Sequence, residues 1–440
     1  MWCGWKFKFN EKERGMDMGC WGRAWRQYHP LVWLLVGGTV FSRAAMFMSL
    51  PFLTIYLAQH TKMDPVLAGL TVGLGPLAGT ICGFVGGNLS DQFGRRTVMV
   101  AAMFLWAGVY IGFAVAEQMF FFMLLNLLNG VCRSFFEPTS QALMADITPP
   151  ERRIRVFGFR YLAINVGAVI GPLIGAVTGI LAGKTAFLIT GTVYFVYAWL
   201  LLLMLNRYRH DLASRVTQAD RERVGMRAAF QVVRNDAALR FFLAGAILAN
   251  IGYAQIDTTL PLYLKQNVMN GELLFSMLLA INAGLVVILQ MILTRWTEKR
   301  PILQSLLIGT ILFAAGMGCF AVGQHWGWFV IGMVILTVGE ILIFPTNSLF
   351  IDRLAPNHLR GTYFGANGFQ GLGWFMGPSL GGWLIHQLGG HWGFAVIGLV
   401  VICAMYFYWM GMRVYQSRSC EFLQEKSAVS SLVTEEKLHI

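Results

Sequence analysis

The stretch Gly-Asn-Leu-Ser-Asp-Gln-Phe-Gly-Arg-Arg, residues 87–96, decides the fold. Two long apolar runs flank it, one ending near Leu89 and the next beginning near Thr97. Each run is long enough to cross a lipid bilayer as an α-helix. The stretch is therefore a short polar turn between two membrane helices.

The turn combines residue types that suit a tight, charged connection at a membrane face. Glycines let two backbones approach and turn, an acid interacts with a helix end, and arginines favour the membrane surface. The residues concerned are Gly87, Gly94, Asp91, Arg95 and Arg96.

This turn resembles the loop motif of the major facilitator superfamily, G-x-L-a-D-r-x-G-r-k, which follows the second transmembrane helix. An ordinary cytoplasmic turn can also contain these residue types, but here both the spacing and the placement match. The resemblance implies a conformational latch, in which Asp91 is held near a helix end or an Arg in one state and released in the other. The matching positions are Gly87, Leu89, Asp91, Gly94, Arg95 and Arg96, and the departures are Ser90 and Gln92.

The composition is that of an all-α, polytopic membrane protein. Of the 440 residues, 56% are hydrophobic and 13% are charged, and the mean hydropathy is +0.58. Soluble proteins are far less apolar. The net charge of +12 comes from basic loops, so we expect no nucleic-acid partner. The seven cysteines show no metal-ligand spacing, and we expect no metal site.

Twelve apolar runs are long enough to span a bilayer. They cover residues 31–58, 66–89, 97–116, 118–144, 156–182, 185–206, 241–264, 273–294, 302–324, 327–350, 362–386 and 392–412. On one side the only basic loop residues are Lys62, Lys184 and Lys265, and all the others lie on the opposite side. By the positive-inside rule, both termini are cytoplasmic in a multi-pass protein of the plasma (inner) membrane.

The longest polar segment divides the spans into six plus six. We expect a cytoplasmic leader at 1–30, an N-terminal six-helix bundle at 31–206, a cytoplasmic central loop at 207–240, a C-terminal six-helix bundle at 241–412 and a cytoplasmic tail at 413–440. Part of the central loop has the pattern of a short amphipathic helix at the membrane surface, with a solvated linker as the alternative.

The two halves of the chain repeat at a fixed spacing. Pro138 recurs as Pro345 and Arg153 recurs as Arg360, in both cases 207 residues later. Such agreement indicates two parallel repeats related by a pseudo-twofold axis along the membrane normal, with the substrate site at their interface.

Five charged residues lie well inside apolar runs and are the candidates for proton coupling in the cavity. A central charge costs about 2.5–3.5 kcal/mol on insertion scales, so these side chains should face a wet cavity or one another. The family resemblance implies such a cavity, lined by helices one, four, seven and ten. The five residues lie on those helices and are Arg43, Arg133, Glu137, Asp257 and Glu340.

Each of these charges has more than one interpretation. Arg133 and Glu137 are four residues apart and can pair on one helix face, either as a structural pair or as a proton site. Glu340 has no basic residue within four positions, which makes it our first choice for the proton carrier. Arg43 either pairs with one of these acids or meets an anionic substrate group. Asp257 is expected nearest the extracellular mouth.

A glycine and proline motif at residues 167–175 resembles the helix-five motif of superfamily antiporters, g-x-x-x-G-P-x-x-G. Its chemistry is close helix packing, and Gly377-Pro378 repeats part of it in helix eleven. The Arg that the family places in helix four is Asn126 here, so its usual role in proton transfer is either absent or taken over by Arg133. The motif residues are Gly167, Gly171, Pro172 and Gly175.

The sequence therefore predicts a secondary active transporter that resembles the drug:proton antiporters and exports small apolar or cationic molecules by alternating access. The alternatives are an exporter or importer of a small metabolite such as a dipeptide, amino acid or sugar, a lipid flippase, and a transport-dead receptor or sensor. The sequence has no Walker A motif and no hydrolase or dinucleotide fingerprint, so neither ATP-driven transport nor an enzyme is expected. We expect a monomer whose partners are its substrate, protons and the bilayer, with the proton gradient in place of a cofactor.

Overall fold

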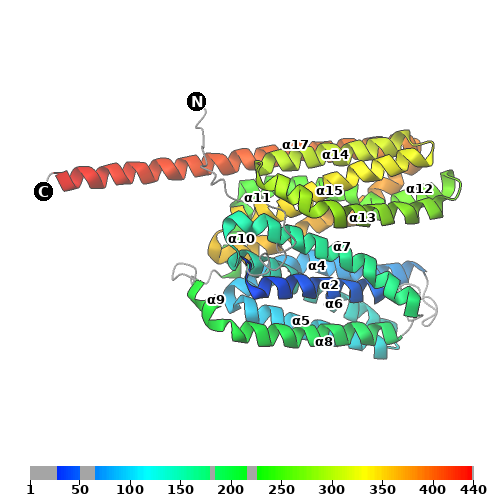
Figure 1. Ribbon diagram of the computed structural model, residues 1–440, viewed down its shortest axis with the longest axis horizontal. Coiled ribbons are helices and arrows are strands. Elements are labelled where there is room, and N and C mark those ends of the chain that lie inside the picture. Colours follow the sequence, from blue (N-terminus) through cyan, green and yellow to red (C-terminus); the bar gives the residue numbers. More distant parts are fainter. Residues whose placement is uncertain (1–26, 50–64, 179–183, 216–224, 439–440) are drawn as a thin grey trace, which may run out of the picture.

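The computed structural model describes residues 27–49, 65–178, 184–215 and 225–438, and this part of the chain is helical and without strands (Figure 1). The apolar runs form helices because their backbone groups then hydrogen-bond within each segment, as a bilayer requires. Ten helical stretches in the described part are long and apolar enough to cross a membrane. One of these, residues 357–417, contains two crossings, and the helix at residues 65–93 completes the predicted twelve.

The first bundle packs its helices around an aromatic core. α2 contacts α7 and α8, α4 contacts α6, and α5 contacts both α6 and α8. Tyr110, Phe113 and Tyr194 are among its fully buried side chains. Its helices are α2 (Pro30–Ser49), α4 (Pro65–Phe93), α5 (Arg95–Val115), α6 (Met119–Asp146), α7 (Arg153–Thr178) and α8 (Lys184–Arg207).

The second bundle repeats this arrangement. α11 contacts α17, α14 contacts α15 and α17, and α13 contacts α15. Its helices are α11 (Ala237–Asp257), α12 (Thr259–Asn267), α13 (Gly271–Glu298), α14 (Ile302–Val322), α15 (Trp326–Leu354), α16 (Arg360–Ala366) and α17 (Gly371–Leu438). Within α17, the backbone of Gly389 has φ 78° and ψ 166°, a conformation open to glycine, and this residue separates the last two membrane crossings.

Three helix boundaries differ from the sequence prediction. The seventh span is not continuous, because α11 ends at Asp257 and Pro261, which lacks a backbone N–H, lies in the first turn of the separate helix α12. The last helix continues to Leu438, past the predicted end of the span at residue 412. In the central loop, the strongly amphipathic helix is α10 (Met226–Asn235), which follows α9 (Arg209–Arg215), whereas residues 216–224 of the expected segment lie outside the described residues.

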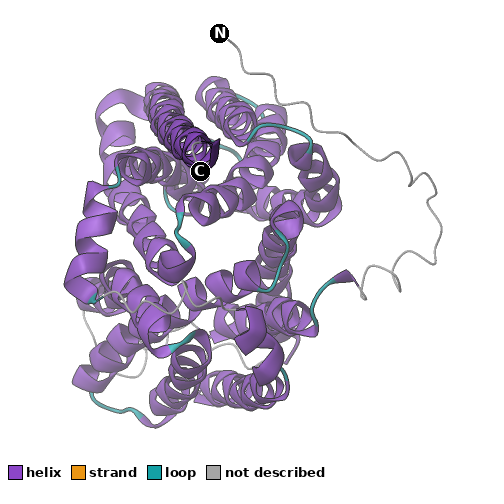
Figure 2. Cartoon of the chain, turned by 90° about the vertical axis from the view of Figure 1, so that its left-hand side faces the viewer, coloured by secondary structure: helices purple, strands orange, loops and turns teal. Residues whose placement is uncertain are grey.

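Both bundles have their arginine-rich connections at the same end, which we call the basic end. It contains α9, α10 and the turns at Gly94, Pro149 and Pro356, and Figure 2 views the molecule from this side. The main contacts between the bundles join α4 to α16 and to the short turn at Asn367–Gln370, α6 to α16, α7 to α13 and α7 to α15. At the basic end, Asp91 bonds Thr362, Arg153 pairs with Asp352 and Arg155 pairs with Glu298, so the bundles are closed against each other there.

Candidate functional site

The predicted latch residue Asp91 joins the two bundles at the basic end. Its Oδ1 accepts a hydrogen bond from the Gly361 backbone N–H at 2.9 Å, and its Oδ2 accepts from the backbone N–H and the hydroxyl of Thr362, each at 2.6 Å. Asp91 also pairs with Arg95 four residues along the chain. The carboxylate therefore contacts the first turn of α16 while it is held by a cation of its own bundle.

Arg95 belongs to a larger set of alternating charges, which we call the gate network. Its members are Asp91, Arg95, Asp146, Arg153, Asp352 and Arg360. The repeat-related arginines make reciprocal contacts: Arg153 reaches Asp352 of the second bundle at 2.8 Å, and Arg360 reaches Asp146 of the first. The network has equal numbers of acids and bases, so its charges balance at the contact between the bundles.

Glycines allow the backbones of α4 and α16 to meet in what we call the glycine seam, formed by Gly83, Gly87, Gly361 and Gly365. A Cβ atom on Gly87 would overlap the carbonyl of Gly361, and one on Gly365 would overlap the carbonyl of Gly83. Gly94 and Arg96, the other two residues of the predicted gating motif, belong neither to the glycine seam nor to the gate network. Gly94 takes φ 89° at the start of α5 and is exposed, and Arg96 is half-buried.

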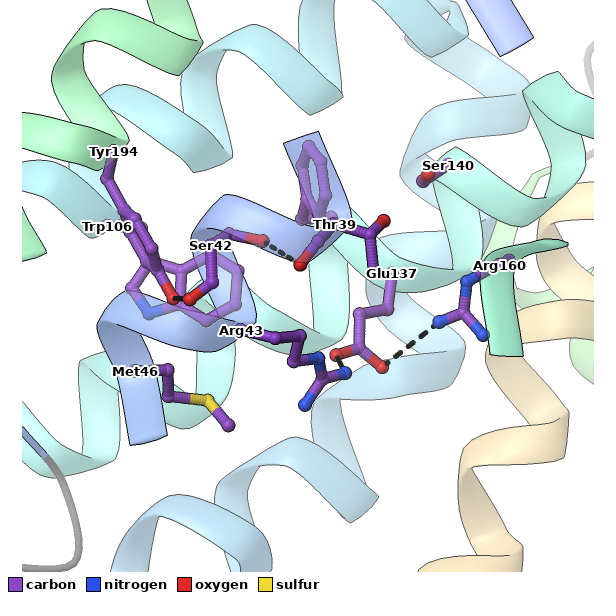
Figure 3. Close-up of a pocket in the computed structure, with 10 residues that line it drawn as sticks. Thr39, Ser42, Arg43, Met46, Trp106, Glu137, Ser140, Arg160 and Tyr194 are labelled. Carbon is purple, nitrogen blue, oxygen red and sulfur yellow. Dashed lines mark hydrogen bonds and ion pairs between the residues drawn. The ribbon is translucent and has the colours of Figure 1, made fainter. Parts of the chain in front are cut away.

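Four charged residues of the first bundle meet in what we call the arginine cluster. Three of them, Arg43, Arg133 and Glu137, were predicted from the sequence, and the fourth is Arg160. Glu137 on α6 lies between Arg43 of α2 and Arg160 of α7 (Figure 3). Its Oε1 pairs with Arg43 and accepts from Arg133 Nε at 3.0 Å, and its Oε2 lies 3.6 Å from an Nη atom of Arg160. The helical pair expected from spacing is therefore present, with two further arginines on the same carboxylate.

Helix packing brings these charges together. Cβ atoms on Gly167 and Gly171 of α7 would overlap α2 near Arg43 and Ala44, so these small residues let α7 lie against α2. Pro172 and Gly175 lie on the same helix, and their side-chain surroundings fall outside the described part. The predicted packing motif thus helps bring Arg43 and Arg160 to the same acid.

Glu340 lies apart from the arginine cluster and has hydrogen-bond donors but no described basic partner. It is fully buried on α15, and it accepts from Tyr253 at 2.9 Å, from Asn282 at 2.8 Å and from the hydroxyl of Tyr161. Tyr253 and Asn282 belong to the second bundle, whereas Tyr161 belongs to α7 of the first. The ring of Tyr161 also stacks on Phe344, with 5.5 Å between centroids.

Asp257 makes no described hydrogen bond or ion pair with the arginine cluster or with Glu340. It is the last residue of α11, is exposed, and makes no described ion pair. Its place at the end of the bundle opposite the basic end agrees with its position near the end of an apolar run.

Sequence analysis missed two residues of the site, Arg160 and Tyr161. Arg160 lies only a few positions inside its apolar run, where an arginine more often extends to the membrane surface. The available signal was its position two turns beyond the repeated Arg153, on a helix that carries the packing motif.

Comparisons with known proteins agree with this architecture. Residues 35–371 match the Major Facilitator Superfamily. The chain is 36% identical over 369 residues to the uncharacterized MFS-type transporter YqjV of Bacillus subtilis, covering 83% of this chain and 89% of that protein. It is 28% identical over 416 residues to a Na⁺, Li⁺, K⁺/H⁺ antiporter of Planococcus maritimus, covering 87% and 96%. The solved fucose:proton symporter of Escherichia coli has a TM-score of 0.71 at 13% identity, covering 88% and 99%.

Proposed function

The chain belongs to the Major Facilitator Superfamily and is a multi-pass membrane transporter, and on this basis we propose that it exports small, mostly apolar molecules in exchange for protons. The basic end is taken as cytoplasmic by the positive-inside rule, in the plasma (inner) membrane. The described conformation then has its cytoplasmic side closed, and substrate leaves from the opposite side.

The observation that carries the proposal is the environment of Glu340. A fully buried carboxylate without a described cation is costly in a membrane protein and marks a site where charge changes are useful. Three groups donate to it, and only the Tyr161 hydroxyl comes from the other bundle. Protonation of Glu340 removes the negative charge that strengthens this bond. Proton binding would therefore weaken a contact between the bundles.

Alternating access follows from this link. With Glu340 ionised, Tyr161 and the gate network hold the basic halves of the bundles together. Proton uptake by Glu340 from the outside would loosen its contact with Tyr161 and favour opening toward the cytoplasm. There the proton leaves and substrate enters. A relative that is named as a cation/proton antiporter, at 28% identity, supports exchange over simple diffusion.

The test uses inverted membrane vesicles whose interior is acidified by respiration. A panel of neutral apolar compounds, cationic dyes, monocarboxylates and dipeptides is added, and proton release is followed with a pH-sensitive dye. We expect at least one compound to release protons with the wild type and none to do so with Glu340→Gln. Glu117→Gln is the matched control, since it makes the same change at an exposed acid between α5 and α6 that lies outside the contacts of Glu340.

Two results would contradict the proposal. If Glu340→Gln released protons as fast as the wild type, Glu340 would not be the proton carrier. If no compound released protons from vesicles that contain folded protein, or if compound and proton moved in the same direction, export by antiport would be wrong.

A further inference from the structure

The arginine cluster holds more positive charge than its surroundings balance. Arg43, Arg133 and Arg160 all pair with Glu137, and no other carboxylate pairs with any of them among the described residues. The three arginines also lie within electrostatic reach of one another. Arginine stays charged in proteins, so three cations against one anion leave an excess of two positive charges.

The four side chains of the cluster differ in exposure. The side chains of Arg43 and Arg160 are 11% and 14% exposed, whereas that of Arg133 is 44% exposed and that of Glu137 is 23% exposed. An incoming group would therefore meet Arg133 and Glu137 first, and the other two arginines would form the floor of the site.

The walls beside the charges combine large apolar and aromatic side chains with the hydroxyl groups of Thr39, Ser42 and Ser140. The pocket that contains Arg43, Glu137 and Arg160 is also lined by Met46, Trp106, Phe136 and Tyr194 (Figure 3). A methionine and three aromatic side chains offer apolar contact surface, and because the free volume in this conformation is about 20 Å³, a substrate body enters only once Glu137 turns away and the pocket widens. The site as a whole combines fixed positive charge with apolar contact surface.

Glu137 shows which anion the arginines can hold. Its carboxylate receives guanidinium groups from three helices, and guanidinium and carboxylate groups match in shape and charge. A separate carboxylate of similar size could take its place and would leave Glu137 free to turn away. A cationic substrate, by contrast, would meet the excess positive charge.

We propose that Arg43, Arg133 and Arg160 form the binding site for a carboxylate group of the transported molecule, and that Glu137 occupies this site when substrate is absent. The substrate class is a small apolar monocarboxylate. The inference rests on the proposed transport function but not on the identity of the proton carrier, because Glu340 lies outside the arginine cluster.

Direct binding to the purified full chain tests this site. The probes are benzoate, indole-3-acetate and octanoate, each compared with its own neutral amide, and binding is measured by calorimetry at fixed pH. We expect at least one carboxylate to bind at least tenfold more tightly than its amide. Glu137→Gln should tighten carboxylate binding several-fold, because the internal competitor loses its charge. Arg133→Gln should weaken it at least tenfold.

Arg295→Gln is the charge-matched control, since Arg295 is exposed on α13 outside the cluster, and it should leave binding unchanged. If a carboxylate binds the wild type tightly but no compound releases protons in the vesicle assay, this site is supported while the proposed proton exchange is contradicted, which separates the two inferences. If Glu137→Gln fails to fold, Arg133→Lys provides the second test, because it keeps the charge but loses the planar fork, and binding should weaken. The proposal is overturned if no carboxylate binds the wild type or Glu137→Gln more tightly than its amide, or if Arg133→Gln binds as the wild type does.

Discussion

Arg160 and Tyr161 are consecutive residues of α7, and they contact acids in opposite bundles. Arg160 lies 3.6 Å from Glu137 of the first bundle, and Tyr161 donates to Glu340 of the second. Consecutive helical side chains point about 100° apart, so one helix can serve both acids. A shift of α7 that breaks one contact must also disturb the other. The proposed substrate site and the proposed proton site are thus linked through one rigid element.

Tyr161→Phe should favour opening at the basic end. The substitution keeps the ring that stacks on Phe344 but removes the hydroxyl that donates to Glu340. Loss of a hydrogen bond to a charged group costs about 1.5–3 kcal/mol, or roughly 10- to 150-fold in the ratio of closed to open molecules. Distances between spin labels on the two bundles report this ratio. Tyr253→Phe removes a donor from the same bundle as Glu340, and equal shifts for the two variants would argue against the bridging role of Tyr161.

Asp91→Asn should loosen the contact between α4 and α16. Asp91 accepts three hydrogen bonds from Gly361 and Thr362, and the amide that replaces it has no negative charge and one acceptor oxygen. We expect the backbone amides of both partners to exchange hydrogen roughly 10- to 100-fold faster, as measured by mass spectrometry of peptides covering residues 355–366. Arg96→Gln, in the same turn, is the comparison. Similar protection in Asp91→Asn and the wild type would mean that Asp91 does not hold α16.

Gly361→Ala should prevent closure of the glycine seam. A Cβ atom at this position would overlap Ser90 and the backbone of Gly87, whereas one on Gly368 would have its nearest neighbour at 3.8 Å. We expect substrate exchange to slow at least tenfold in Gly361→Ala and to change little in Gly368→Ala. Thermal unfolding of both variants distinguishes a transport defect from a folding defect. If both alanines are tolerated equally, close backbone contact is not required for the cycle.

Transport should respond strongly to membrane potential. Export of a monocarboxylate in exchange for a proton moves two charges in the same electrical direction. Each charge gains about 2.3 kcal/mol per 100 mV, so two gain about 4.6 kcal/mol, or roughly a thousandfold in the limiting concentration ratio. Potassium gradients with valinomycin, applied to proteoliposomes at equal pH on both sides, set the potential. If the transport of benzoate, or of another carboxylate that binds, does not change with the membrane potential, the exchange of one carboxylate for one proton is excluded.

The sequence predicted the features that depend on local pattern. Apolar run lengths gave the twelve spans, and the spacing of Arg133 and Glu137 indicated their pairing on one helix. The repeated arginines, Arg153 and Arg360, marked equivalent positions in the two halves before their reciprocal contacts were visible.

Features that depend on packing between helices were not predictable in this way. Arg43 and Glu137 are 94 residues apart, and Tyr161 and Glu340 are 179 apart, so only the tertiary arrangement decides that they meet. Arg160, the third arginine of the arginine cluster, was missed for the same reason. The break between α11 and α12 was signalled by Pro261, but its position depends on how the chain leaves the last turn of α11.

The glycine seam has a consequence for the speed of opening. Where α4 meets α16 through Gly83, Gly87, Gly361 and Gly365, no side chains of these residues interlock, so separation requires no change of rotamer from them. The barrier to opening at this end then comes from the polar bonds around Asp91 and from the apolar cluster beside them, in which Phe157 of the first bundle packs against Phe364 of the second. Because glycines alone specify register weakly, the alignment in which the two helices rejoin is set by Asp91, whose carboxylate accepts from the backbone N–H groups of Gly361 and Thr362.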